Sequence, residues 1–197
     1  MRDTGRSMIV YLHGFNSSPA SKKAQQLGAY MRSRGLGADF DCPQLPHRPD
    51  EAIAVAEAAI ARAAGRPITL VGSSLGGFYA TWLAEKHGFN AVLINPAVMA
   101  QRDLRELIGP QKNLYSGEEY QLTEVHIAGW ERLMVPTITP SRYFLIVETG
   151  DEVLDYREAV ERYRGARQIV IPGGDHTLQS FPGHMPAILE FAGYAPG

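Results

Sequence analysis

The chain has 197 residues, enough for one substantial hydrophobic core and too few for two domains of ordinary size. Its 19 Lys and Arg residues against 21 Asp and Glu residues give a net charge of −2, which excludes the strongly basic surface typical of nucleic-acid-binding proteins. Hydrophobic residues make up 45% and charged residues 20%, which is typical of a folded globular protein.

The N-terminal region and the cysteine content bear on location. Arg2 and Arg6 precede an apolar run that covers only Met8–Leu12, shorter than the roughly 7 to 15 residues of a signal-peptide core. No run reaches the roughly 18 apolar residues of a membrane-spanning helix. Cys42 is the only cysteine, so no internal disulfide can form. We therefore expect a cytoplasmic protein without a membrane span.

Short apolar runs alternate with helical patterns along the chain. The expected strands cover residues 8–12, 38–42 (the weakest), 68–71, 91–94, 143–147 and 168–171. The first expected helix begins at Ser18-Pro19, where Ser18 can cap, and ends before Gly35. The other expected helices cover residues 51–64 (with Asp50 as cap), 75–87, 156–164 and 186–192. Strands alternating with helices of this length predict right-handed crossovers, and hence a parallel sheet with helices on both faces.

Residues 101–141 interrupt the alternation, because no convincing strand is visible there. A long irregular segment in a compact domain is typical of a lid or binding loop, so we expect a lid-like insertion within one domain that spans residues 1–197. Tyr115 and Tyr120, with Trp130, are candidates for the walls of a substrate pocket. Packing of these rings on the sheet edge is an equally compatible interpretation.

The segment Gly72-Ser73-Ser74-Leu75-Gly76 matches G-x-S-x-G, the pattern of a nucleophile elbow. It lies between an expected strand and an expected helix, as the elbow requires. The Ser74 hydroxyl would project above the sheet edge at a helix N-terminus, where amide dipoles favour negative charge. The Leu75 amide could donate to an oxyanion. The alternative is a glycine-rich turn with no chemical role.

A serine nucleophile needs a base, and His176 is the only histidine after Ser74 that directly follows an expected strand. His184, at the start of a helix, is the second choice. We expect His87 to stabilise a helix end, and we interpret His126 as a lid or surface residue.

The acid that orients the base should follow a neighbouring strand, because parallel strands all end at the same sheet edge. Asp151 directly follows the strand at 143–147 and could accept a hydrogen bond from Nδ1 of His176. Asp155 is the second choice, and it is better placed to cap the helix that begins at Tyr156.

The loop after the first strand reads Leu12-His13-Gly14-Phe15-Asn16. Gly14 allows the backbone to turn its amides inward, so the Phe15 amide is the second candidate oxyanion donor. Gly14 and Asn16 are expected to border the substrate. His13 is expected to position this turn rather than to transfer a proton.

Several of these segments together resemble the YqiA-like family of small α/β-hydrolase esterases. The resemblance rests on YLHGFNSSP (11–19), PQLP (43–46), VGSSLGGFYATWLAE (71–85), NPAV (95–98), TGDEVLDYREAV (149–160) and GGDH (173–176). It implies a compact α/β-hydrolase fold and activity on short acyl esters or thioesters. It also implies that Ser74 is the nucleophile, Asp151 the acid and His176 the base. Matching the first strand to the third strand of the full eight-stranded fold predicts six parallel strands in the order 2-1-3-4-5-6.

The sequence thus favours a serine hydrolase that cleaves small-molecule carboxylic esters through an acyl-enzyme, with no metal or organic cofactor required. A thioesterase acting on acyl-CoA or an acyl carrier is an alternative, because esters and thioesters react through similar intermediates. A hydrolase-fold binding protein without turnover is an alternative of another class, since fold does not fix function. Such a protein usually lacks a triad member, whereas all three are present here.

Overall fold

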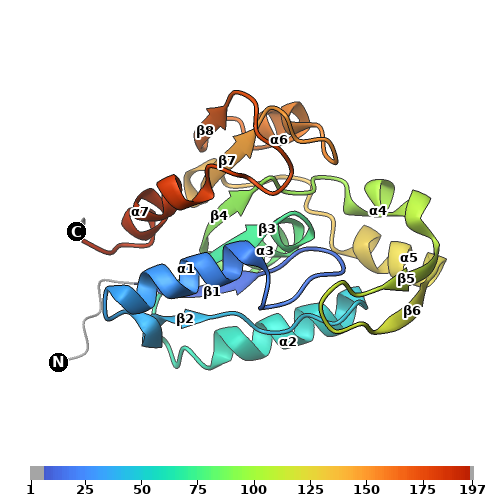
Figure 1. Ribbon diagram of the computed structural model, residues 1–197, viewed down its shortest axis with the longest axis horizontal. Helices are drawn as coiled ribbons and strands as arrows, with labels where there is room; N and C mark the ends of the chain where they lie inside the picture. The colour runs from blue at the N-terminus through green and yellow to red at the C-terminus, as the bar shows by residue number, and fades with distance from the viewer. Residues whose placement is uncertain (1–6, 196–197) are drawn as a thin grey trace.

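The computed structural model describes residues 7–195, so Arg2 and Arg6 lie outside the described residues. Its centre is a six-stranded parallel sheet in the order β2-β1-β3-β4-β7-β8, which runs from the bottom to the top of Figure 1. The strands are β1 (Met8–Leu12), β2 (Phe40–Asp41), β3 (Ile68–Ser73), β4 (Asn90–Ile94), β7 (Tyr143–Glu148) and β8 (Arg167–Ile171). Counted along the sheet strands alone, this order is 2-1-3-4-5-6, so the predicted topology is confirmed.

Helices cover both faces of the sheet. One face packs against α1 (Lys22–Ser33) and α7 (Phe181–Phe191), and the other against α2 (Pro49–Ala61), α3 (Leu75–His87) and α6 (Tyr156–Arg162). Helix α5 (Glu124–Arg132) packs on α2, away from the strands. Along β1, the side chains of Ile9 and Tyr11 pack on the face covered by α1 and α7, and those of Val10 and Leu12 pack on the opposite face. Burial of both faces explains why the strand sequences are continuously apolar rather than alternating. None of the helices in residues 7–195 is long and apolar enough to cross a membrane.

Three helix starts differ from the expectation. The N-cap of α1 is Ser21 rather than Ser18, and that of α2 is Arg48 rather than Asp50, which lies in the first turn. In α2 the proline at the start of the helix has its φ preset for helix and lacks the amide hydrogen that would go unpaired there. Helix α7 begins at Phe181 and continues through Pro186, because Phe181, Ile188 and Leu189 are buried against the sheet.

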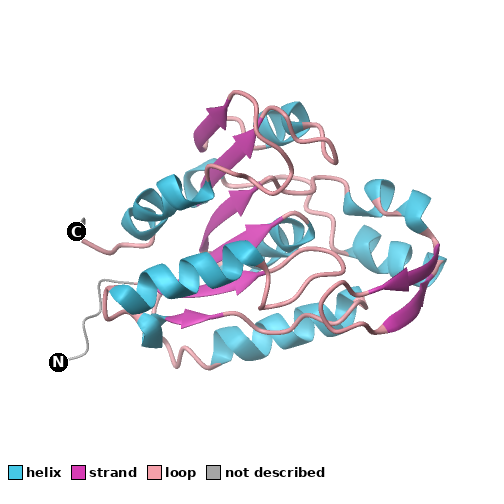
Figure 2. Cartoon of the chain, viewed as in Figure 1, coloured by secondary structure: helices cyan, strands magenta, loops and turns pink. Residues whose placement is uncertain are grey.

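Residues 101–141 contain more regular structure than the sequence predicted. They hold the end of α4 (Ala100–Asp103), a 3-10 turn at Arg105–Leu107, α5, and an antiparallel hairpin of β5 (Gly109–Lys112) and β6 (Glu119–Leu122). The expectation of no strand was therefore wrong. Most hairpin side chains are exposed or half-exposed, so no apolar run marks the strands. Figure 2 shows this hairpin apart from the central sheet. A further 3-10 turn, Pro140–Arg142, leads into β7.

Candidate active site

Ser74 lies at the turn between β3 and α3. Its backbone has φ 54° and ψ −122°, a strained conformation for a residue with a side chain. The turn is tight because backbone passes close on both sides: a Cβ on Gly76 would lie 1.9 Å from the Leu12 carbonyl oxygen, and one on Gly72 would lie 2.4 Å from the Gly76 oxygen. These two positions therefore admit only glycine. The sequence folds here into the strand–turn–helix geometry of an elbow.

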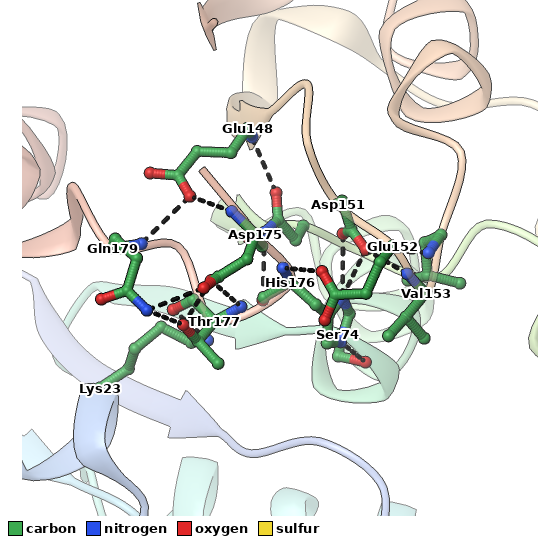
Figure 3. Close-up of polar contacts among 12 residues, drawn as sticks. Lys23, Ser74, Glu148, Asp151, Glu152, Val153, Asp175, His176, Thr177 and Gln179 are labelled. Atoms are coloured by element: carbon green, nitrogen blue, oxygen red, sulfur yellow. Dashed lines mark hydrogen bonds and ion pairs between the residues drawn. The ribbon is translucent and has the colours of Figure 1, made fainter. Parts of the chain in front are cut away.

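The structure brings Ser74, His176 and Asp151 together in one chain of hydrogen bonds (Figure 3). Nε2 of His176 lies 3.1 Å from Oγ of Ser74, and Nδ1 lies 2.9 and 2.8 Å from the two carboxylate oxygens of Asp151. An ionised carboxylate can only accept hydrogen bonds, so Nδ1 carries the proton. Nε2 is then free to accept the proton of the serine hydroxyl.

The Asp151 carboxylate is kept ionised by its partners. Its side chain is only 2% exposed, and burial alone would raise its pKa. The hydrogen bonds from His176 and from the Leu154 and Val153 amides outweigh burial and lower the pKa below its ordinary value. The Asp151 side chain is therefore negatively charged at neutral pH.

The second-choice residues have other contacts. Asp155 caps α6, as predicted, by accepting the Arg157 amide at 2.9 Å. His184 lies in the first turns of α7. His87 is the last residue of α3, and its Nε2 lies 2.8 Å from Oε1 of Glu57 in α2.

His126 is buried, so it is not a surface residue. Its Nδ1 accepts the Thr123 amide at the start of α5, and its Nε2 lies 3.0 Å from Nδ1 of His47. Burial lowers the pKa of His126, which matches its role as an acceptor at Nδ1. This capping contact explains why the ring lies inside the protein.

The loop after β1 lies directly against Ser74, since a Cβ on Gly14 would be 3.2 Å from Cβ of Ser74. His13 holds this loop: its Nδ1 bonds the Gly14 carbonyl at 3.1 Å, and its Nε2 accepts the Leu45 amide at 3.0 Å. Burial lowers the pKa of His13, consistent with this neutral bridging ring. Within residues 7–195, the amides of Phe15 and Leu75 donate to no protein acceptor, so both are available to a ligand.

A cavity of about 540 Å³ opens at Ser74 and is of a size typical for small-molecule sites. Gly14, Phe15, Asn16 and Leu75 border it. Its apolar wall comes from Leu104, Leu107, Leu114, Tyr115, Val153 and Leu154. Its polar wall comes from Ser17, Ser21, Lys22, Lys23, Thr177 and Gln179.

The three aromatic candidates have different places. Tyr115 lines the cavity and is 49% exposed. Tyr120 instead donates its hydroxyl to Oδ1 of Asn16 at 2.8 Å and stacks on His47 at 4.0 Å. Trp130 is fully buried and donates to the Tyr79 hydroxyl at 2.8 Å, so it belongs to the core. Only Tyr115 among them is in contact with the cavity.

Three polar side chains near His176 had been assigned no role from the sequence: Glu148, Asn95 and Glu152. Each hydrogen-bonds the backbone next to or at His176. The available signal was position, because Glu148 and Asn95 each come at the end of an otherwise apolar strand at the edge where Ser74 lies. Among the described residues, no group of three or more His, Cys, Asp and Glu side chains is arranged to hold a metal ion.

Comparisons with known proteins agree with this fold. The model of a family described as "Uncharacterised protein family (UPF0227)" matches residues 8–193. A crystal structure from Agrobacterium vitis S4 has a TM-score of 0.78 at 19% identity, covering 96% of this chain and 88% of that one. Est1E from Butyrivibrio proteoclasticus has a TM-score of 0.70 at 14% identity, covering 96% of this chain and 88% of that one. A structure from work on the metagenome-derived lipolytic enzymes LipS and LipT has a TM-score of 0.68 at 18% identity, covering 96% of this chain and 95% of that one. The predicted α/β-hydrolase fold is thus confirmed.

Proposed function

We propose that this chain, which belongs to the UPF0227 family, is a serine hydrolase that cleaves carboxylic esters of short acyl chains. The family match covers nearly the whole chain and agrees with the resemblance to YqiA-like proteins. Est1E and the LipS and LipT enzymes share this fold, and the description of LipS and LipT as lipolytic supports hydrolase chemistry for this chain. The observation that carries the proposal is the unbroken hydrogen-bonded series from Ser74 through His176 to Asp151.

In the proposed reaction, Oγ of Ser74 attacks the ester carbonyl carbon while Nε2 of His176 takes the hydroxyl proton. The negative charge that develops on the carbonyl oxygen is stabilised by the Phe15 and Leu75 amides. Collapse of this intermediate breaks the bond to the alcohol, and the imidazolium returns its proton to the leaving alkoxide. Water then attacks the acyl-enzyme with His176 again as base. The bond between the acyl carbon and Oγ of Ser74 breaks, the imidazolium returns its proton to Oγ, and the carboxylic acid leaves. Asp151 stabilises the imidazolium in both halves.

The cavity wall gives the acyl group and the alcohol different surroundings. Tyr115, Val153 and Leu154 offer apolar surface, whereas Thr177 and Gln179 follow His176 directly along the chain. Because His176 protonates the alcohol, we assign the leaving group to the polar side and the acyl chain to the apolar side.

A thioester substrate is the second candidate, because Lys22 and Lys23 line the same cavity. Partial burial lowers the pKa of Lys23 to about 8, and its ammonium donates to the Thr177 carbonyl at 2.9 Å. Lys22 is exposed and could attract the phosphates of acyl-CoA. Lys22→Ala should then raise KM for acyl-CoA and leave KM for a neutral ester unchanged.

A cytoplasmic location stays a prediction.

The deciding experiment measures hydrolysis of p-nitrophenyl esters of increasing acyl length, together with the matching thioesters, by the wild-type chain and by Ser74→Ala. Mass spectrometry after treatment with a fluorophosphonate should find the adduct on Ser74. A binding protein without turnover would give neither hydrolysis nor the adduct.

A further inference from the structure

The position of His176 depends on the loop that carries it. Residues 172–180, here called the His176 loop, connect β8 to α7 and contain no helix or strand. Backbone of this kind can drift, yet Nε2 of His176 must stay near the Ser74 hydroxyl for proton transfer. The contacts that hold the loop therefore matter for the chemistry.

Glu148, the last residue of β7, binds the loop on both sides of His176 with its carboxylate (Figure 3). One oxygen accepts the Asp175 and Gln179 amides at 2.9 and 3.1 Å. The other accepts the Ser180 amide at 2.9 Å and the Ser180 hydroxyl at 2.6 Å. The residue is 1% exposed, and burial alone would raise its pKa, but these hydrogen bonds outweigh burial and lower the pKa. Glu148 is thus a buried, ionised carboxylate whose four bonds all go to the His176 loop.

The loop approaches Glu148 closely enough to require glycine. A Cβ on Gly174 would lie 1.9 Å from the Glu148 carboxylate, and Gly174 has φ +73°. The glycine next to Asp175 therefore serves the contact with this carboxylate as well as the turn.

The peptide groups of His176 itself are held by two more side chains. Its amide donates to Glu152 at 2.9 Å, and its carbonyl accepts from Nδ2 of Asn95 at 3.1 Å. The Asn95 side chain also donates to the Asp175 carbonyl at 3.1 Å and accepts the Glu148 amide at 3.0 Å. Both backbone polar groups of His176 are therefore bonded to side chains that follow neighbouring strands.

We propose that Glu148, assisted by Asn95 and Glu152, is a positioning residue that holds His176 between Ser74 and Asp151. The inference rests on the proposed function, because it concerns the rate of the step that His176 performs. Glu148 acts through the loop backbone and not on the substrate, so its loss should lower kcat and leave KM nearly unchanged. A displacement of about 1 Å at a catalytic group can cost about 100-fold in rate.

The main test compares Glu148→Gln with Glu85→Gln. Glutamine at 148 places an amide donor against backbone N–H donors, so the loop should shift. Glu85 is a matched control, because it is also a largely buried carboxylate with several hydrogen bonds, from Thr139, Arg142 and Tyr143. We expect Glu148→Gln to lower kcat for a p-nitrophenyl ester by about 100-fold at a temperature where it is folded. Glu85→Gln should lose stability and keep its kcat.

Glu152→Ala is a second variant that will not endanger folding, since Glu152 is exposed. It should lower kcat severalfold, and Glu152→Gln should restore most of that loss because its amide oxygen can accept the same N–H. Should Glu148→Gln be unfolded, this pair tests the positioning of His176 on its own.

A proton NMR signal for the His176 Nδ1–H bonded to Asp151 provides a readout that does not depend on hydrolysis. We expect this signal in the wild type and in Glu85→Gln, and its loss or shift in Glu148→Gln. The proposal is overturned if Glu148→Gln keeps both the signal and the wild-type kcat, or if Glu85→Gln loses as much kcat. Failure of the proposed function would look different: the wild type would not hydrolyse esters, while the NMR comparison would still report on Glu148.

Discussion

Both carboxylate oxygens of Asp151 lie within hydrogen-bond distance of Nδ1 of His176, at 2.9 and 2.8 Å. One of these oxygens also accepts the Val153 and Leu154 amides at 2.9 Å. The amides fix the carboxylate, and the carboxylate fixes the tautomer of the ring. Asp155, four positions later, uses its carboxylate to cap α6 instead.

Asp151→Asn should therefore lower kcat by about 10⁴-fold, the effect of the wrong histidine tautomer in serine proteases. Asp155→Asn should act on stability alone, at a cost of about 1 kcal/mol or less for the cap. Esterase rates and thermal midpoints of both variants separate the two roles. Loss of activity in a stable Asp155→Asn, with Asp151→Asn still active, would reverse the assignment.

Ser74→Ala should abolish ester hydrolysis and leave the fold intact, because the side chain emerges at the apex of the elbow and only Oγ is removed. Ser73 is the comparison, since it ends β3 and its side chain is buried. Ser73→Ala should cost activity far less. Initial rates with circular dichroism as a check on folding decide the matter, and an inactive Ser73→Ala beside an active Ser74→Ala would contradict the mechanism.

His176→Ala should damage turnover nearly as much as the loss of Ser74, because members of a triad act as a unit. His184→Ala should keep most of the activity, since His184 lies in α7 and is partly exposed. The measurement is kcat on the same p-nitrophenyl ester. The opposite ranking of the two variants would identify His184 as the base.

Much of the fold followed from local patterns. The strands of the central sheet are continuous apolar runs because both faces are buried, and such runs are visible without a structure. The β5–β6 hairpin was missed because its side chains are mostly exposed and leave no such run. Helix α7 was predicted too short because Pro186 was placed at its start. In the structure the helix begins at Phe181, whose side chain is buried.

The candidate site was predictable where chemistry and strand ends coincide. Ser74, Asp151 and His176 each follow a strand, so the parallel sheet gathers them at one edge. The end of β7 also places Glu148 at this edge. Its contacts were not predictable, because nothing in the sequence indicates that residues 172–180 fold back over the end of β7. The partners of Tyr120 and His126 also depend on long-range contacts, with Asn16 and His47.

The last prediction concerns the pH dependence of stability through Glu85. Burial would raise the pKa of Glu85, but hydrogen bonds from Thr139 and Tyr143 and the charge of Arg142 outweigh it, so the folded-state pKa lies below the ordinary value of 4.5. The native state therefore favours the carboxylate more than the unfolded state does. This stabilisation is fully present above about pH 4.5 and is lost as pH falls through the folded-state pKa.

Glu85→Gln should accordingly reduce the free energy of unfolding at pH 7 by about 2 kcal/mol, the scale of hydrogen bonds to a charged group. As pH falls below about 4.5, the wild type loses this advantage and the two stabilities should converge. Glu161→Gln is the control, because Glu161 is an exposed residue paired with Arg164, and its loss should cost no more than about 0.5 kcal/mol. Urea unfolding at several pH values between 7 and 3.5 measures all three proteins, that interval spanning the titration of a carboxyl whose ordinary pKa is 4.5. A gap between wild type and Glu85→Gln that stays constant over this range would mean that the charge of Glu85 contributes nothing, and that only its shape is needed.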